Sequence, residues 1–136
     1  MRAAVLPGVD AAFELREVPE PSGEALVRVR AAGVNFADVL IRRGRYPQMP
    51  DFPVVLGSEI AGELEDGTRV MAITSGSGGY AEVAAVDRAQ LVPLPAHASY
   101  AQGRGHLSRL GPPCFAERPS SSAPFASHDQ ERTEKI

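Results

Sequence analysis

The stretch "AAGVNFADVLIRRGRYP", Ala31 to Pro47, is the most informative part of this 136-residue sequence. Its helical spacing is carried by Phe36, Val39, Leu40 and Arg43. Asn35 stands where a helix N-cap is expected, and Asp38 lies in the first turn, where a carboxylate is favourable. Gly44 is expected to end the helix. The stretch therefore predicts one short helix beginning at Phe36.

Short strands separated by turn residues are predicted on both sides of this helix. The strand candidates are "AAVL", "FELREV", "EALVRVRA", "AGELE", "TRVMAI", "YAEVAAV" and "QLVPL". In "EALVRVRA", small or apolar residues at 25, 27 and 29 alternate with residues 26, 28 and 30, so that one face packs while the other meets water. Strands of this length and spacing predict a barrel or a sandwich. The fold class is mainly β with short helices.

The composition is that of an ordinary globular protein, with 43% hydrophobic and 23% charged residues. No apolar run approaches the ~20 residues that span a bilayer. A net charge of -3 gives no broad basic field for nucleic acid. The beginning "MRAAVLPG" lacks the apolar segment of a secretory leader, so we expect a cytoplasmic protein without membrane partners. The single cysteine, Cys114, excludes an internal disulfide and a cysteine-based zinc cluster.

The composition changes after about residue 100. Residues 1–97 contain 13 valines, whereas residues 101–136 contain none and are rich in Gly, Pro, Ser and charge. Such a segment buries too little apolar surface to offset the entropy of ordering. We expect a folded domain at residues 1–100 and a disordered tail at residues 101–136.

Five motifs in a fixed order carry a family resemblance. They are "AAGVNFADVLIRRGRYP", "FPVVLGSEIAG", "GTRVMA", "GGYAEVAAV" and "LVPLP". Together they closely resemble the catalytic, GroES-like domain of medium-chain dehydrogenases/reductases, in the branch of the zinc-independent, zeta-crystallin-like quinone oxidoreductases. The resemblance runs from Met1 to about Ala101. It implies a partly open β-barrel of the alcohol dehydrogenase N-terminal type.

The residue types at two positions argue against zinc. Zinc-dependent members of the superfamily carry a cysteine within the segment corresponding to residues 33–38 and a histidine between the glycine and glutamate that match Gly57 and Glu59. Asn35 and Ser58 occupy these positions here. An amide and a hydroxyl are poor substitutes for zinc ligands. The three histidines outside the motif are read as ordinary surface residues: His97, His106 and His128.

For the zinc-free branch, the resemblance implies hydride transfer from NADPH to a quinone or an α,β-unsaturated carbonyl. It places Asn35 at the nicotinamide and substrate cleft, and the helix N-cap, which the spacing predicts, is a second role that the same residue can hold. Tyr46 is either a cleft residue that stacks on the acceptor or a loop aromatic that covers the core. Asp38 either orients a cofactor hydroxyl or serves only the helix start. Glu59 is expected to be partly buried, with a structural hydrogen-bonding role.

The segment "GSGGYA", residues 76–81, matches the loose pattern G-x-G-x-x-G/A of dinucleotide loops. The residues that follow it have no clear helical start, and Ala101 or Gln102 stands where an acidic residue is expected, so we interpret it as a loop between strands.

Complete relatives continue into a helix, a Rossmann domain and a return segment. "PAHASYAQG" begins such a helix, and nothing after Gly103 resembles the rest. We therefore expect about the first third of an enzyme, inactive alone, arising from a changed reading frame or as one half of a split reductase. A non-catalytic GroES-like binding or regulatory module is the alternative, because the fold also resembles the co-chaperonin. Apolar surface left uncovered predicts self-association.

Overall fold

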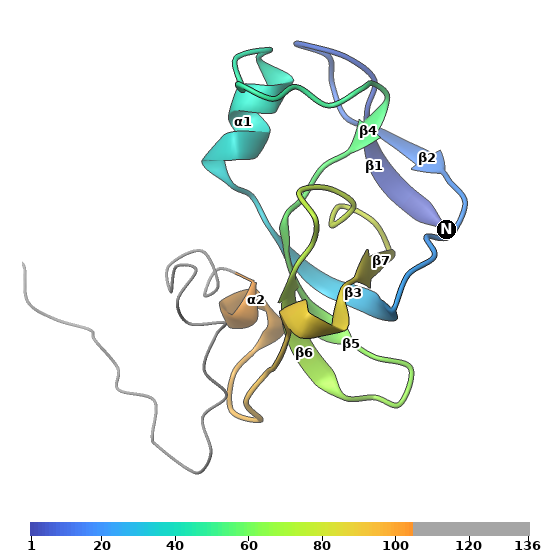
Figure 1. The fold of residues 1–136 in the computed structure, drawn as a ribbon, viewed down its shortest axis with the longest axis vertical. Coiled ribbons are helices and arrows are strands. Elements are labelled where there is room, and N and C mark those ends of the chain that lie inside the picture. Colours follow the sequence, from blue (N-terminus) through green and yellow to red (C-terminus); the bar gives the residue numbers. More distant parts are fainter. Residues whose placement is uncertain (105–136) are drawn as a thin grey trace, which may run out of the picture.

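Two antiparallel sheets form the framework of the protein in a computed structural model that describes residues 1–104 (Figure 1). The smaller sheet has the order β2-β1-β4, and its strands are β1 (Arg2–Leu6), β2 (Glu14–Glu17) and β4 (Val54–Val55). The larger sheet has the order β7-β3-β5-β6-β8, and its strands are β3 (Ala25–Gly33), β5 (Glu59–Glu63), β6 (Arg69–Ile73), β7 (Val83–Val86) and β8 (Leu91–Pro93). In Figure 1 the smaller sheet lies in the upper half and the larger sheet curls through the lower half.

Three short helical segments complete the domain: α1 (Phe36–Arg42), the 3-10 helix η1 (Arg88–Gln90) and α2 (Tyr100–Gly103). The predicted fold class, mainly β with short helices, is confirmed. The helix predicted from Phe36 is also confirmed, and Gly44 follows it with φ +63, a conformation that glycine adopts without strain. None of the helices in the described residues is long and apolar enough to cross a membrane.

The main core lies on one face of the larger sheet. Alternation along β3 is confirmed, because Ala25 and Val27 are buried while Leu26 and Arg28 are exposed. The buried cluster consists of Val27, Ile60, Val70, Ala72, Ala84 and Val86. Burying each large aliphatic side chain stabilises the fold by roughly 1.5 to 3 kcal/mol relative to leaving it exposed. A second cluster, Leu6, Ile41 and Leu56, packs α1 onto the smaller sheet.

Three strands differ from the sequence prediction, and one of them, predicted as "YAEVAAV" at residues 80–86, begins three residues later as β7. The strand predicted as "AGELE", residues 61–65, begins and ends two residues earlier, because Glu59–Glu63 pairs with both β3 and β6 and Leu64 belongs to the following turn. Strand β4 was not predicted. Its two valines pair with Val5 and Leu6 of β1, and so short a segment has no periodicity of its own to reveal it.

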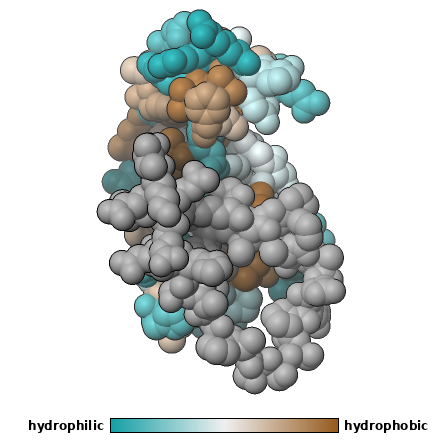
Figure 2. Space-filling view, turned by 90° about the vertical axis from the view of Figure 1, so that its left-hand side faces the viewer, coloured by the Kyte–Doolittle hydropathy of each residue, from teal (hydrophilic) through white to brown (hydrophobic). Residues whose placement is uncertain are grey.

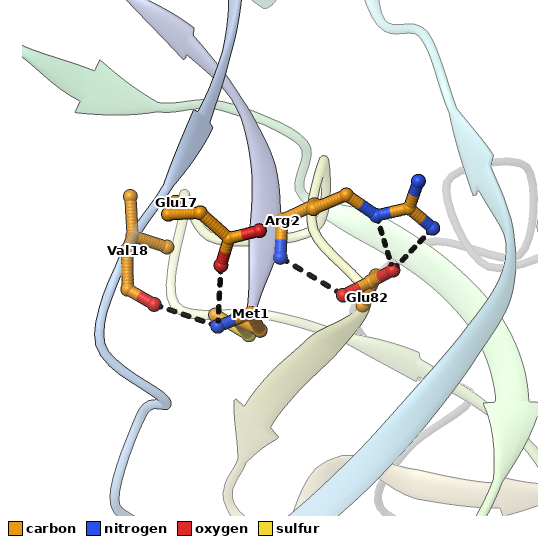
Figure 3. A network of polar contacts seen from close by, with 5 residues as sticks. All are labelled: Met1, Arg2, Glu17, Val18 and Glu82. Atoms are coloured by element: carbon orange, nitrogen blue, oxygen red, sulfur yellow. Dashed lines mark hydrogen bonds and ion pairs between the residues drawn. The ribbon is translucent and has the colours of Figure 1, made fainter.

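Polar contacts at the N-terminus join the two sheets, as Figure 3 shows. The Met1 ammonium group donates to the Val18 carbonyl at 2.9 Å and lies 3.5 Å from a Glu17 carboxylate oxygen. The Arg2 backbone N–H and guanidinium Nε donate to the two Glu82 carboxylate oxygens at 2.9 and 2.8 Å. Since Glu82 immediately precedes β7, these exposed contacts fix the position of β1 more than they add stability.

The helix expected from "PAHASYAQG" is present as α2, which Ser99 begins with a capping box to Gln102. The guanidinium of Arg69 stacks on the Tyr100 ring at 4.6 Å and donates to the Ala98 carbonyl at 2.6 Å. Helix α2 crosses the domain boundary predicted at residue 100, and that boundary stays a prediction. Most of the predicted tail, including His106, Cys114 and His128, lies outside the described residues, and its predicted disorder stays a prediction.

A pH dependence follows from the contact between α2 and β5. The Tyr100 hydroxyl donates to a Glu63 carboxylate oxygen at 2.5 Å, and this bond, followed by that from Arg30, lowers the pKa of Glu63 below its usual 4.5. A carboxyl group whose pKa is lower in the folded chain than in the unfolded chain stabilises the fold at any pH above its unfolded pKa. This stabilisation is lost as the pH falls through the folded pKa. We expect Tyr100→Phe, which keeps the ring for Arg69, to flatten the fall in thermal stability below pH 4.5.

Melting temperatures followed by circular dichroism from neutral to acidic pH measure this effect. In a Glu63→Gln background the Tyr100→Phe change should leave the pH profile unaltered. A profile for Tyr100→Phe alone that matches the unmodified chain would contradict the prediction.

Candidate functional site

The site is built around Asn35 and Ser58, which lie 23 residues apart in sequence. Asn35 connects β3 to α1, and Ser58 immediately precedes β5. Because β3 and β5 are antiparallel, with Gly33 opposite Glu59, the second residue after β3 and the residue before β5 lie at the same end of the sheet. The Asn35 side-chain nitrogen donates to the Ser58 hydroxyl oxygen at 2.8 Å. The two positions whose residue types argue against zinc therefore contact each other.

The loop that carries Ser58 is held from behind by Thr74. The buried Thr74 hydroxyl donates to the Gly57 carbonyl at 2.9 Å, and the Thr74 N–H donates to the Ser58 carbonyl at 2.8 Å. Gly57 itself has φ +97, a left-handed conformation that favours glycine. Ser58 is thus presented on a fixed turn.

Asp38 fixes the other half of the pair. Its carboxylate, 6% exposed, accepts the Asn35 backbone N–H at 2.8 Å, and its own N–H donates to the Asn35 carbonyl at 3.1 Å. The predicted N-cap position of Asn35 is confirmed, since its backbone is extended at the beginning of α1. Asn35 can fill both roles at once, because its backbone bonds Asp38 at the beginning of α1 while its side-chain amide bonds Ser58.

Tyr80 completes the network, although the sequence analysis predicts it only as the start of a strand. Its hydroxyl donates to the same Asp38 oxygen at 2.8 Å. Burial, then the hydrogen bond to Asp38 and the charge of its carboxylate, raise the pKa of Tyr80 far above its usual 10.0, so the phenol stays a neutral donor. A Cβ on Gly57 would lie 2.6 Å from the Tyr80 ring, so the ring packs directly against the turn before Ser58. The only sequence feature that could have indicated a role for Tyr80 was its position directly after two glycines, in the tripeptide "GGY".

A carboxylate next to this pair belongs to Glu59, which is 3% exposed at the start of β5. Its burial is more complete than expected, and its Oε2 lies against the backbone of Gly33. Among residues 1–104 we find no hydrogen bond to this carboxylate, so its expected structural partner is not identified. Within the same residues no three His, Cys, Asp or Glu side chains gather as metal ligands do.

Comparison of the whole sequence with known proteins identifies the family of this fold. The alcohol dehydrogenase GroES-like domain matches residues 21–96. The chain belongs to this family. A mouse quinone oxidoreductase is 37% identical over 109 residues, which cover 72% of this chain and 32% of that protein. An acryloyl-coenzyme A reductase of Metallosphaera sedula is 42% identical over 80 residues, covering 56% of this chain and 24% of the relative.

Solved structures place the GroES-like domain in the same group. The quinone oxidoreductase of Thermus thermophilus, studied alone and with NADPH, superimposes with a TM-score of 0.68 at 40% identity, covering 74% of this chain and 34% of that one. A Pseudomonas syringae quinone oxidoreductase superimposes with a TM-score of 0.65 at 32% identity, covering 76% of this chain and 37% of that one. The expected quinone oxidoreductase branch of the medium-chain dehydrogenases/reductases is confirmed. The chain spans about a third of the length of these relatives.

The remaining predicted residue, Tyr46, lies in a different environment of the GroES-like domain. It is half-buried and packs against the cluster of Leu6, Ile41 and Leu56, as a loop aromatic covering the core does. Its role toward a substrate stays a prediction.

The glycine loop of this GroES-like domain does not fit a dinucleotide. Gly78, Gly79 and Tyr80 donate their N–H groups to the carbonyls of residues 55, 57 and 56 at 2.7 to 2.9 Å, so none of the three is free to hold a phosphate. Ala81 then bridges to Ala3, and β7 follows rather than a helix. Within residues 1–104, this glycine loop therefore does not form a binding site for a pyrophosphate.

Two exposed apolar residues flank Asn35 in the sequence. Val34 is 72% exposed and Phe36 is 75% exposed, whereas Asn35 between them is half-buried. Figure 2 shows the side of the molecule on which α1 lies, with apolar side chains gathered in the upper half beneath a hydrophilic top. A polar pair with apolar neighbours suits a ligand that has a flat apolar body and one polar atom.

Proposed function

We propose that this chain supplies the acceptor-binding part of a zinc-independent reductase that transfers hydride from NADPH to a quinone or an α,β-unsaturated carbonyl. The observation that carries the proposal is the Asn35–Ser58 hydrogen bond, which joins the two positions where zinc-dependent members of the superfamily keep metal ligands. The names of the quinone oxidoreductase and acryloyl-coenzyme A reductase relatives support the same acceptor class.

The chemistry of the site fits an acceptor that needs no metal. Conjugation in a quinone or enone spreads incoming charge, so positioning and hydrogen bonds to the oxygen take the place of a Lewis acid. We propose Asn35 and Tyr46 as the residues that face the substrate. Asn35 and Asp38 are the proposed residues on the cofactor side, and the buried Asp38 acts there by holding the backbone of Asn35.

NADPH supplies the hydride when it is bound, but residues 1–104 offer only the nicotinamide end of its site. The N–H groups of residues 78–80 are already bonded to the segment before Ser58. We propose that the pyrophosphate is held outside residues 1–104, so that the reaction requires both parts. The proposed location is the cytoplasm.

The 136-residue chain should therefore not oxidise NADPH in the presence of a quinone, and its affinity for NADPH should be weaker than micromolar. Nicotinamide absorbance measures the first and titration calorimetry the second, on chain shown by circular dichroism to be folded. Mixing with the nucleotide-binding part of a quinone oxidoreductase should restore activity. A rate above a no-protein control for the chain alone, or micromolar binding, would contradict the expectation.

A GroES-like binding module, or one half of a split reductase, is the second candidate. The observation that favours it is the glycine loop, because the N–H groups of residues 78–80 are bonded to backbone carbonyls and offer no phosphate site there. One stoichiometric protein partner in a pull-down, with no activity in the mixing experiment, supports the module. Activity with a nucleotide-binding partner supports the split enzyme.

A further inference from the structure

The Asn35–Ser58 pair leaves one hydrogen-bond donor uncommitted. A serine hydroxyl carries one proton and two acceptor lone pairs. The Ser58 oxygen accepts from Asn35 at 2.8 Å, and the Ser58 backbone carbonyl is taken by Thr74. Among residues 1–104 we find no acceptor for the Ser58 hydroxyl proton. The amide therefore orients this hydroxyl while its proton stays available.

The surroundings hold the donor still and leave it reachable. Ser58 is half-buried, between Gly57, whose carbonyl is bonded to Thr74, and the buried Glu59 at the start of β5. A donor that is fixed before a ligand arrives loses little conformational freedom on binding. The Asn35–Ser58 bond also polarises the hydroxyl, because hydrogen bonds in a chain strengthen one another.

We propose that the Ser58 hydroxyl donates a hydrogen bond to the carbonyl oxygen of a conjugated ketone, with Val34 and Phe36 contacting its apolar ring. This assignment rests on the proposed function and names a residue that performs it. Such a donor gains strength as negative charge develops on the oxygen, which is the role a metal plays in the zinc enzymes.

The test uses the full chain and duroquinone, whose methylated ring offers no open position for attack by Cys114. Carbon-13 labelling of its carbonyls allows the stretching frequency of the bound quinone to be read by infrared difference spectroscopy. We expect binding to lower this frequency in the unmodified chain. Ser58→Ala should abolish the shift and weaken the dissociation constant, measured by equilibrium dialysis, by about three- to tenfold.

Two variants serve as controls. Ser58→Thr keeps a hydroxyl at the position and should retain the frequency shift. Ser77→Ala removes an exposed hydroxyl from the glycine loop and should change neither the shift nor the affinity. Circular dichroism and a melting curve establish that each variant is folded.

The possible failures are distinguishable. Quinone that binds the unmodified chain without a frequency shift, or that keeps its shift and affinity in Ser58→Ala, overturns the assignment of Ser58 and leaves the proposed function standing. Failure of the unmodified chain to bind duroquinone at all overturns both. Loss of the shift in Ser58→Ala and its return in Ser58→Thr support the donor role.

Discussion

Gly62→Ala is expected to lower the free energy of unfolding by about 3 kcal/mol or more, and failure of this variant to fold is the same result in its extreme form. Gly62 lies in β5 opposite Val29 of β3. A Cβ there would clash with the Arg28 carbonyl oxygen and would lie 2.8 Å from a Val27 methyl carbon. Backbone of a central strand cannot move aside cheaply, so the two strands must separate and the core cluster opens with them.

Urea unfolding followed by circular dichroism measures this loss. Gly8→Ala is the matched control, since a Cβ at Gly8 meets nothing within 4 Å and the φ of this glycine is not positive. Its stability should stay within about 0.5 kcal/mol of the unmodified chain. A Gly62→Ala protein that unfolds at nearly the same urea concentration as the Gly8→Ala control would show that the two strands are not held this closely.

Tyr80→Phe is expected to lower the free energy of unfolding by about 1.5 to 3 kcal/mol, the usual value for a hydrogen bond to a charged group. The variant keeps the ring that packs against Gly57 and removes only the hydroxyl that donates to Asp38. The Asp38 carboxylate is 6% exposed, so water replaces the lost donor poorly. Because Asp38 also holds the Asn35 N–H, the beginning of α1 should loosen.

Denaturant unfolding again gives the free energy, and Tyr46→Phe is the control, since we find no hydrogen bond of the Tyr46 hydroxyl within residues 1–104. The raised pKa of Tyr80 adds a second readout. The stabilisation of the fold by neutral Tyr80 is fully present at pH values below 10.0, the pKa of this tyrosine in the unfolded chain. It is lost as the pH rises toward the higher pKa of the folded chain. The unmodified chain should therefore lose stability above about pH 10, whereas Tyr80→Phe should lack that part of the loss. Equal stability of Tyr80→Phe and Tyr46→Phe at neutral pH would refute the role of the Asp38 contact.

Local signals in the sequence predicted the elements around the site well. The spacing from Phe36, the N-cap at Asn35 and the stop at Gly44 involve residues within two turns of one another, so α1 was predictable. Alternation along β3 revealed its buried face for the same reason. Strand β4 was not predictable, because two residues become a strand only when β1 lies beside them.

The sequence by itself determined the family, the mainly β fold and the residue types at the two positions where zinc enzymes keep ligands, because residue identity and short-range spacing carry that information. Tertiary structure alone decided that Asn35 meets Ser58, that Tyr80 reaches Asp38 from 42 residues away, and that the glycine-loop N–H groups are already bonded. The physical reason is register. Which distant groups come within hydrogen-bonding distance depends on how β3, β5 and β6 align, and strand alignment is set by the packed core rather than by neighbours in the chain.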